Sequence, residues 1–354
     1  KIYKLSCVLS LAFAVCACDF EPDLTQNTPT DKAYETLQDV QNGTIGAYQA
    51  LGYYPFLGNY AIAYGDFAGG LADGSSSSGH FYGQSNWTVS ETDAELEGIW
   101  QYGFMVVDRT VRTINGANKV LTTSANLSDE DKATLYYNKS QCFGLRALAY
   151  FTLSNFFCKP YNKGVEEKGL PIIKDKPIEA FKNSTRASLG DTYQFICDDI
   201  DSALVNSEKA GKQSLQYFYM NKAAIYALKA RVNLYMGKYD VAEAAAKKAI
   251  ELKGKGNGTS TDTDPTDETY LNMWASVNVT DEDIFTISKT ENDNLSANAL
   301  NTLYGSYNGS VSAYCSSFFT DTDIRANLIG TVDSNTGGCR KYQGLETSQA
   351  TSNI

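Results

Sequence analysis

The chain of 354 residues is 43% hydrophobic, which is enough to bury a full core and excludes a disordered tail or a disulfide miniprotein. Its 30 basic and 41 acidic residues give a net charge of −11, which argues against nucleic acid or anionic lipid headgroups as partners. The single histidine, His80, excludes a multi-histidine metal site, and any Ser/His or Cys/His catalytic pair would have to use it. Aromatic residues make up 12% of the chain, so we expect rings that bind a ligand.

The first 17 residues have the pattern of a secretory signal peptide. A positively charged start precedes an apolar run over residues 5–15, much shorter than the roughly 20 residues that span a bilayer. The run ends in a lipobox-like sequence, so we predict cleavage before Cys18 and acylation of its thiol; an ordinary signal peptide with a chance cysteine is the alternative. Residues 18–30 are acidic and contain proline, which indicates a tether. We therefore expect an outer-membrane protein that is anchored by lipid and faces the cell exterior.

The cysteines indicate neither a disulfide framework nor a zinc site. Five remain after the signal peptide and Cys18 are set aside, and no two of them have C-x-x-C spacing. Cys142 and Cys197 fall within helical patterns, so we expect them to be small buried hydrophobes.

Apolar residues at helical spacing predict four long helices. The first follows Thr36 and Asp39, which have the spacing of a capping box. The second covers residues 100–121, and Ser128 opens the third. Ser188 opens the fourth.

Residues 221–252 resemble a tetratricopeptide unit, which is a helix–turn–helix repeat. Gly237 stands where the turn requires a left-handed residue, and Ala230 and Ala242 stand where two helices pack closely. A single unit cannot bury its own apolar face, so we predict a helical scaffold over residues 31–252 with a loop insertion at 53–95.

Residues 253–354 have little helical periodicity and are expected to be rich in loops. Residues 283–287 alternate like a strand. The loop 253–268 contains four acidic residues that can hold calcium, although a solvated acidic loop fits the spacing better. These residues are Asp262, Asp264, Asp267 and Glu268.

The order of these features is similar to that of the SusD/RagB-like outer-membrane lipoproteins. The resemblance covers nearly the whole chain, and its most specific part is the Leu-Arg-Ala-x-x-Tyr-Phe block at 145–151 with Arg-x-Ser at 186–188. The other matching features are Cys18, Gly46-Ala47-Tyr48, Trp100, Leu170-Pro171, Thr185, Tyr193, Asp199, the tetratricopeptide-like pair, Ile284-Phe285 and Asp323-Ile324-Arg325.

The resemblance implies a mainly α fold, in which four tetratricopeptide-like helical pairs carry an irregular, loop-rich face. It also implies capture of a nutrient, usually glycan, and its delivery to a SusC-like TonB-dependent transporter, with no catalysis and no cofactor. Family members continue with a further helix, so residues 253–354 are expected to form an incomplete part of the fold.

Two stretches combine rings with short polar side chains, as a sugar site requires. Each of these rings can instead serve the fold and bind no ligand. Trp87 can equally pack within a short strand, and His80 is expected to be a loop residue without catalytic role. Rings at helical spacing, such as Trp100 and Tyr150, are expected in the core, and Arg146 and Arg186 are expected to tie helices through carboxylates such as Asp199. The candidate glycan-binding residues are Asp73, His80, Phe81, Tyr82, Asn86, Trp87, Trp274, Tyr304, Tyr307 and Tyr314.

Two other functions fit the same residues. Tetratricopeptide grooves and tyrosine-rich faces also suit extended peptides, so the protein can instead be a peptide-binding lid of a transporter. A glycosidase that uses two carboxylates needs no histidine, but no particular acidic pair stands out in the sequence.

Overall fold

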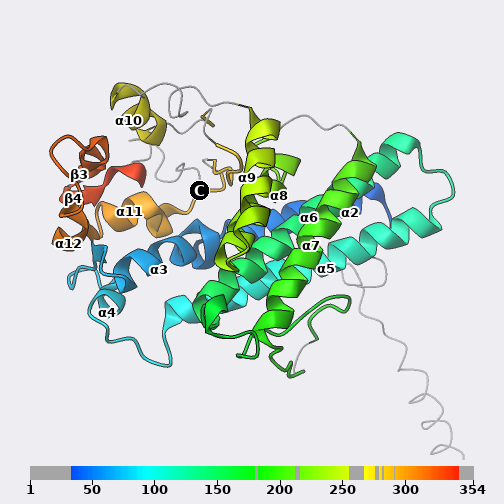
Figure 1. Cartoon of the computed structure of the whole chain (residues 1–354), viewed down its shortest axis with the longest axis horizontal. Coiled ribbons are helices and arrows are strands. Elements are labelled where there is room, and N and C mark those ends of the chain that lie inside the picture. The colour runs from blue at the N-terminus through cyan, green and yellow to red at the C-terminus, as the bar shows by residue number, and fades with distance from the viewer. Residues whose placement is uncertain are drawn as a thin grey trace, which may run out of the picture.

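The computed structural model describes residues 33–179, 182–211, 216–254, 267–275, 279–280, 283–290 and 292–342. The fold is mainly α, as expected (Figure 1). The signal peptide, the tether and the side chains of the acidic loop, including Asp262 and Glu268, lie outside the described residues.

Side-chain caps fix where the long helices begin. In α2 (Leu37–Leu51) the Thr36 side chain accepts from the Asp39 N–H, and the Asp39 carboxylate accepts from the Thr36 N–H at 2.8 Å, which completes the predicted capping box. Ser128 and Asp131 form the same box at the start of α6 (Asp129–Phe157).

The second helix, α5 (Ala94–Thr123), begins six residues before Trp100. The Asp93 carboxylate accepts from the Leu96 N–H at 2.7 Å and caps the helix there. Its cap therefore lies within the segment that was expected to be a loop.

The predicted helix–turn–helix unit is present. Helix α7 (Leu189–Ala210) precedes it, and α8 (Lys222–Tyr235) and α9 (Tyr239–Lys253) form the pair. Gly237 has φ +74° at the turn between them. Ala242 is buried as close packing of the pair requires, whereas Ala230 is only half-buried.

Helix α6 is the centre of the core and packs against α2, α5 and α7. Tyr150 is fully buried there, with its hydroxyl donating to the Pro171 carbonyl at 2.9 Å. Arg146 forms two bonds of 2.7 Å with Asp199 on α7, as expected for a helix tie. Arg186 is also structural, but its partners are main-chain carbonyls, such as that of Phe157, rather than a carboxylate.

Cys142 is buried as expected, whereas Cys197, expected to be buried as well, is only partly so. Cys142 is fully buried, and burial raises the pKa of its thiol to about 12. Cys197 is half-buried with its sulfur 3.9 Å from that of Met236.

We call helices α2 and α5–α9 the helical body, and residues 54–90 and 292–342 the irregular end. Figure 1 shows the labelled elements of the irregular end gathered at the left, beside the long helices. The irregular end consists of η1 (Tyr54–Gly58), α3 (Tyr60–Ala68), β1 (Ala72–Asp73), α4 (Tyr82–Ser85), η3 (Ser296–Asn298), α11 (Leu300–Tyr304), β2 (Ser310–Val311), α12 (Ala313–Ser316), η4 (Ile324–Leu328), β3 (Ile329–Val332), β4 (Asn335–Cys339) and η5 (Arg340–Tyr342).

Two expectations for local structure are wrong. The insertion 53–95 is not only loop, because η1 and α3 lie within it. Residues 283–287 form no strand, since the Thr286 N–H donates to the Tyr217 carbonyl without a ladder around it. Outside both regions lie the short η2 (Tyr161–Lys163) and α10 (Asp267–Ala275).

Among the described residues, no helix is both long enough and apolar enough to cross a bilayer.

Candidate functional site

A short β-ladder joins the two stretches that carry the candidate rings. Strand β1 pairs antiparallel with β2, with Ala72 opposite Val311 and Asp73 opposite Ser310. The Ser78 hydroxyl adds a bond of 2.8 Å to the Tyr307 carbonyl. Residues more than 200 positions apart in the sequence are thereby brought to one end of the molecule (Figure 1).

Two of the predicted glycan-binding rings, Phe81 and Tyr304, belong to the core. Their exposed fractions are only 1% and 2%. Phe67 lies between them, stacked on Phe81 at a centroid distance of 4.9 Å and on Tyr304 at 5.7 Å. The Tyr304 hydroxyl donates to the Asp66 carboxylate at 3.0 Å. These rings form the small core of the irregular end, so the assignment of Phe81 and Tyr304 to ligand binding is corrected.

Close backbone packing turns Phe81 into this core. Phe81 has φ +51°, and a Cβ at residue 74 would come within 2.6 Å of the Phe81 carbonyl group. Glycine at 74 therefore lets the serine-rich loop, residues 75–78, fold back on itself.

Other candidate rings are exposed. Trp87 is 79% exposed, Tyr314 61% and Tyr82 43%, and for Trp87 this favours a surface role over a strand plug. Phe318 was missed by the sequence reasoning, although it stands four residues after Tyr314; it is 57% exposed, and the two rings meet edge to face at 4.7 Å. We call Tyr82, Trp87, Tyr314 and Phe318 the ring surface.

His80 and Tyr307, one from each of the same two stretches, form a stacked pair. Their centroids are 4.1 Å apart and their planes differ by only 8°. Both are half-buried, so the pair presents edges rather than two open faces. The stack fixes the serine-rich loop against the segment that follows α11.

Two polar candidates lie in the same segments. Asp73 is exposed on β1, next to buried Ala72. The Asn86 amide donates to the Tyr82 carbonyl at 2.8 Å, which closes the short helix α4 directly before Trp87. Both side chains are accessible to solvent and suited to orient hydroxyl groups.

Trp274 does not join the ring surface. It lies on α10, which Figure 1 shows apart from α4 and α12. Its ring is half-buried, and the Lys341 ammonium lies 4.6 Å from the ring centroid. Its indole N–H is buried, and none of the described residues accepts a hydrogen bond from it.

The acidic groups near the site serve the fold. Asp93 and Glu95 both accept from the Gln84 amide, at 2.7 and 3.1 Å, and Asp93 also caps α5. Burial raises the pKa of Asp66, although the Tyr304 hydroxyl and Lys341 oppose the rise. In the part of the chain that the structure describes, no group of three His, Cys, Asp or Glu side chains is placed to hold a metal ion.

A groove of about 1060 Å³ lies between α3, the end of α6, α8 and residues 283–287. The sequence does not predict this groove, because its rings stand at helical or loop spacing, which gives no sign that they line a common groove. Arg231 is exposed on its wall, and its other side chains include Phe151, Tyr161, Tyr193, Tyr235 and Phe285.

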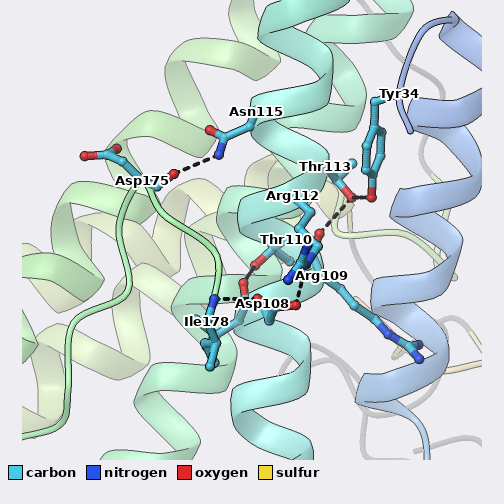
Figure 2. A network of polar contacts seen from close by, with 10 residues as sticks. Tyr34, Asp108, Arg109, Thr110, Arg112, Thr113, Asn115, Asp175 and Ile178 are labelled. Atoms are coloured by element: carbon cyan, nitrogen blue, oxygen red, sulfur yellow. Dashed lines mark hydrogen bonds and ion pairs between the residues drawn. The ribbon is translucent and has the colours of Figure 1, made fainter. Parts of the chain in front are cut away.

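The polar face of α5 shows a purely structural network (Figure 2). Asp108 accepts from the Ile178 N–H at 2.7 Å and pairs with Arg112 at 2.6 Å. The Asn115 amide donates to the Asp175 carbonyl at 2.8 Å. These bonds fasten the segment after α6 along the helical body, away from the ring surface.

Residues 28–234 match the model of a SusD-like protein family, which is described as "Starch-binding associating with outer membrane". The chain therefore belongs to the SusD-like family, which is associated with the outer membrane and binds carbohydrate rather than catalysing a reaction. No match was found among curated proteins.

Solved structures share the fold. A SusD superfamily protein from Bacteroides thetaiotaomicron is 22% identical with a TM-score of 0.71, over 90% of this chain and 68% of that one. A SusD-like carbohydrate binding protein from Bacteroides vulgatus is 16% identical with a TM-score of 0.72, over 90% and 68%. A laminarin binding SusD-like protein is 20% identical with a TM-score of 0.53, over 72% and 51%.

Proposed function

We propose that the protein is a lipid-anchored surface receptor that captures glycan on the ring surface and delivers it to a SusC-like TonB-dependent transporter. The observation that carries this proposal is the β1–β2 pairing, which gathers exposed rings at one end of a SusD-like fold. Flat sugar faces stack on such rings, and neighbouring polar groups such as Asp73 and Asn86 orient the hydroxyls.

The site is non-catalytic in this proposal. A retaining or inverting glycosidase needs two carboxylates that face each other across the bond to be cleaved. Asp93 and Glu95 are engaged by Gln84 instead, and Asp66 by the Tyr304 hydroxyl. Release of sugar from a bound polysaccharide would contradict this part of the proposal.

Binding can be tested by native gel electrophoresis in gels that contain single polysaccharides. We expect at least one polysaccharide to retard the protein and the pair of changes Trp87→Ala and Tyr314→Ala to abolish the retardation with an unchanged thermal midpoint. Tyr239→Ala is the matched control, since Tyr239 is 69% exposed on the helical body. If no polysaccharide retards the protein, or the double variant still binds, the proposal fails.

The anchor has its own test. Cys18→Ser should release the protein from the membrane fraction, because in this proposal the acylated Cys18, and not a spanning helix, holds the protein at the membrane. A variant that stays membrane-bound and is cleaved at the same site would contradict the lipid anchor.

The groove favours a second candidate, a peptide ligand. Its aromatic wall and the exposed guanidinium of Arg231 suit an apolar peptide that carries a carboxylate. Arg231→Ala should weaken such a peptide and leave polysaccharide retardation unchanged, which separates the two candidates.

A further inference from the structure

The two segments that build the ring surface contain no lysine or arginine. The chain has 30 such residues, yet none occurs within residues 33–108 or within 290–324. These ranges hold α3, β1 and α4 on one side of the β-ladder, and α11, β2 and α12 on the other. All four exposed rings lie in them, so the segments that carry the rings contribute no permanent positive charge of their own.

Acidic residues are plentiful in the same segments. Asp73 lies on β1, and Glu91 and Glu97 are exposed between Trp87 and the first turns of α5. Asp93 and Glu95, which accept from the Gln84 amide, add further negative charge to the same end. The ring surface is therefore set in a negative field.

Among the described residues, the cations that reach this end from outside these segments already have partners. Arg325 holds the Asp323 carboxylate with bonds of 2.6 and 2.9 Å and lies over the Phe319 ring. Lys341 lies over Trp274. The Arg340 guanidinium donates to the Asn327 carbonyl of η4 at 3.4 Å and packs against Gly330 of β3, while its Nε is buried without a hydrogen-bond partner among the described residues. His80, the single histidine of the sequence, is stacked on Tyr307.

Anionic glycans are recognised by unpaired cations. Uronate and sulfate groups take charge-assisted, often bidentate bonds from arginine, and like charges in contact weaken binding. From the missing cations and the exposed acids, we propose that the ligand is a neutral glycan, without uronate or sulfate groups. This inference rests on the proposed glycan-binding function and narrows its substrate class.

The test compares one polysaccharide with its own charged derivative. A panel of neutral and acidic polysaccharides is screened first, and the neutral one that binds best is then carboxymethylated. We expect the derivative to bind about tenfold more weakly at low salt, with part of the difference lost at high salt because repulsion between exposed charges is screened.

A charge reversal sharpens the test. Glu91→Lys places a cation four residues after Trp87 in the same exposed segment and should strengthen binding of the carboxymethylated derivative several-fold, with neutral binding unchanged. Glu251→Lys is the control, since it changes the net charge equally at an exposed site in the last turn of α9, where a cation suits the helix dipole.

The outcomes separate the two proposals. Weak binding of the derivative together with its rescue by Glu91→Lys supports the neutral glycan. Equal or tighter binding of the derivative, or retention by acidic polysaccharides alone, overturns the neutral class and leaves glycan binding intact. If no polysaccharide is retained, glycan binding itself is overturned, and the neutral class with it.

Discussion

The helical body and the irregular end use aromatic residues in opposite ways. In the body, helical spacing decides burial, and Tyr150 and Phe151 lie in the core as their positions on α6 predict. In the irregular end, Phe81 is buried and its neighbour Tyr82 is 43% exposed, and the four-residue helix α4 that begins at Tyr82 is too short for a helical period to assign either. Burial there depends on pairing with residues near 304–311, far away in the sequence. Regular periodicity thus predicts a core, and long-range pairing creates the site.

The largest effect is expected in the body, at the buried ion pair. Arg146→Met leaves the Asp199 carboxylate buried without its partner, since both side chains are only 3% exposed, and should cost about 3–5 kcal/mol in the free energy of unfolding. The double change Arg146→Met with Asp199→Leu should recover most of the loss.

Denaturant unfolding measures the free energy of unfolding of the single and the double variant. Lys229→Met is the control, since it removes a surface ion pair between α8 and α7. That control should lose at most about 1 kcal/mol. Equal losses at the two pairs would mean that α6 and α7 are not tied through a buried contact.

A similar loss is expected at Phe81 but not at Tyr82. Phe81→Ala removes the ring that stacks on Phe67 and should cost about 3–5 kcal/mol, while Tyr82→Ala should leave the thermal midpoint nearly unchanged. Thermal melts of the two variants test the comparison at adjacent positions. Equal melts would contradict the division between small core and ring surface.

The helical pair α8–α9 should show a smaller effect. Ala242→Leu inserts extra methyl groups where α9 is buried against α8 and should cost about 1–3 kcal/mol. Ala244→Leu, on the exposed side of the same helix, serves as the control. An unchanged midpoint for Ala242→Leu would mean that the pair does not pack as a repeat.

The smallest effect concerns pH. Burial raises the pKa of Asp66 above its unfolded value, so the folded state holds this proton more tightly. The stabilising contribution of the protonated form is present at low pH and is lost as the pH rises above the usual carboxyl range. Asp66→Asn should flatten this part of the pH dependence of the melt, whereas Asp73→Asn, at an exposed site, should not. Identical pH profiles for the two variants would contradict a raised pKa of Asp66 in the folded state.

The sequence was sufficient for the helical body, because its signals are local. Thr36 with Asp39 and Ser128 with Asp131 mark the helix starts within a single turn, and Gly237 marks the turn of the last pair. The pairing of Arg146 with Asp199 followed from their places on neighbouring helices.

The irregular end was less predictable for a physical reason. Helix α3 is apolar around most of its surface and lies next to several glycines, so it has no amphipathic period to detect. Phe81 and Trp87 stand six residues apart in one loop and differ in exposure from 1% to 79%. That difference comes from contacts with Phe67 and Tyr304, which no local pattern reveals.

The central claim is that glycan binds to exposed rings of the irregular end and not to the helical body. The chain has three tryptophans in three settings: Trp87 on the ring surface, Trp100 packed against the body's core, and Trp274 beneath Lys341. Incorporation of 5-fluorotryptophan gives each a fluorine resonance, which single Trp→Phe changes assign. On addition of a polysaccharide that retards the protein, we predict that the Trp87 resonance shifts and the Trp100 resonance stays in place. A bound state in which the Trp87 resonance does not move would contradict the account.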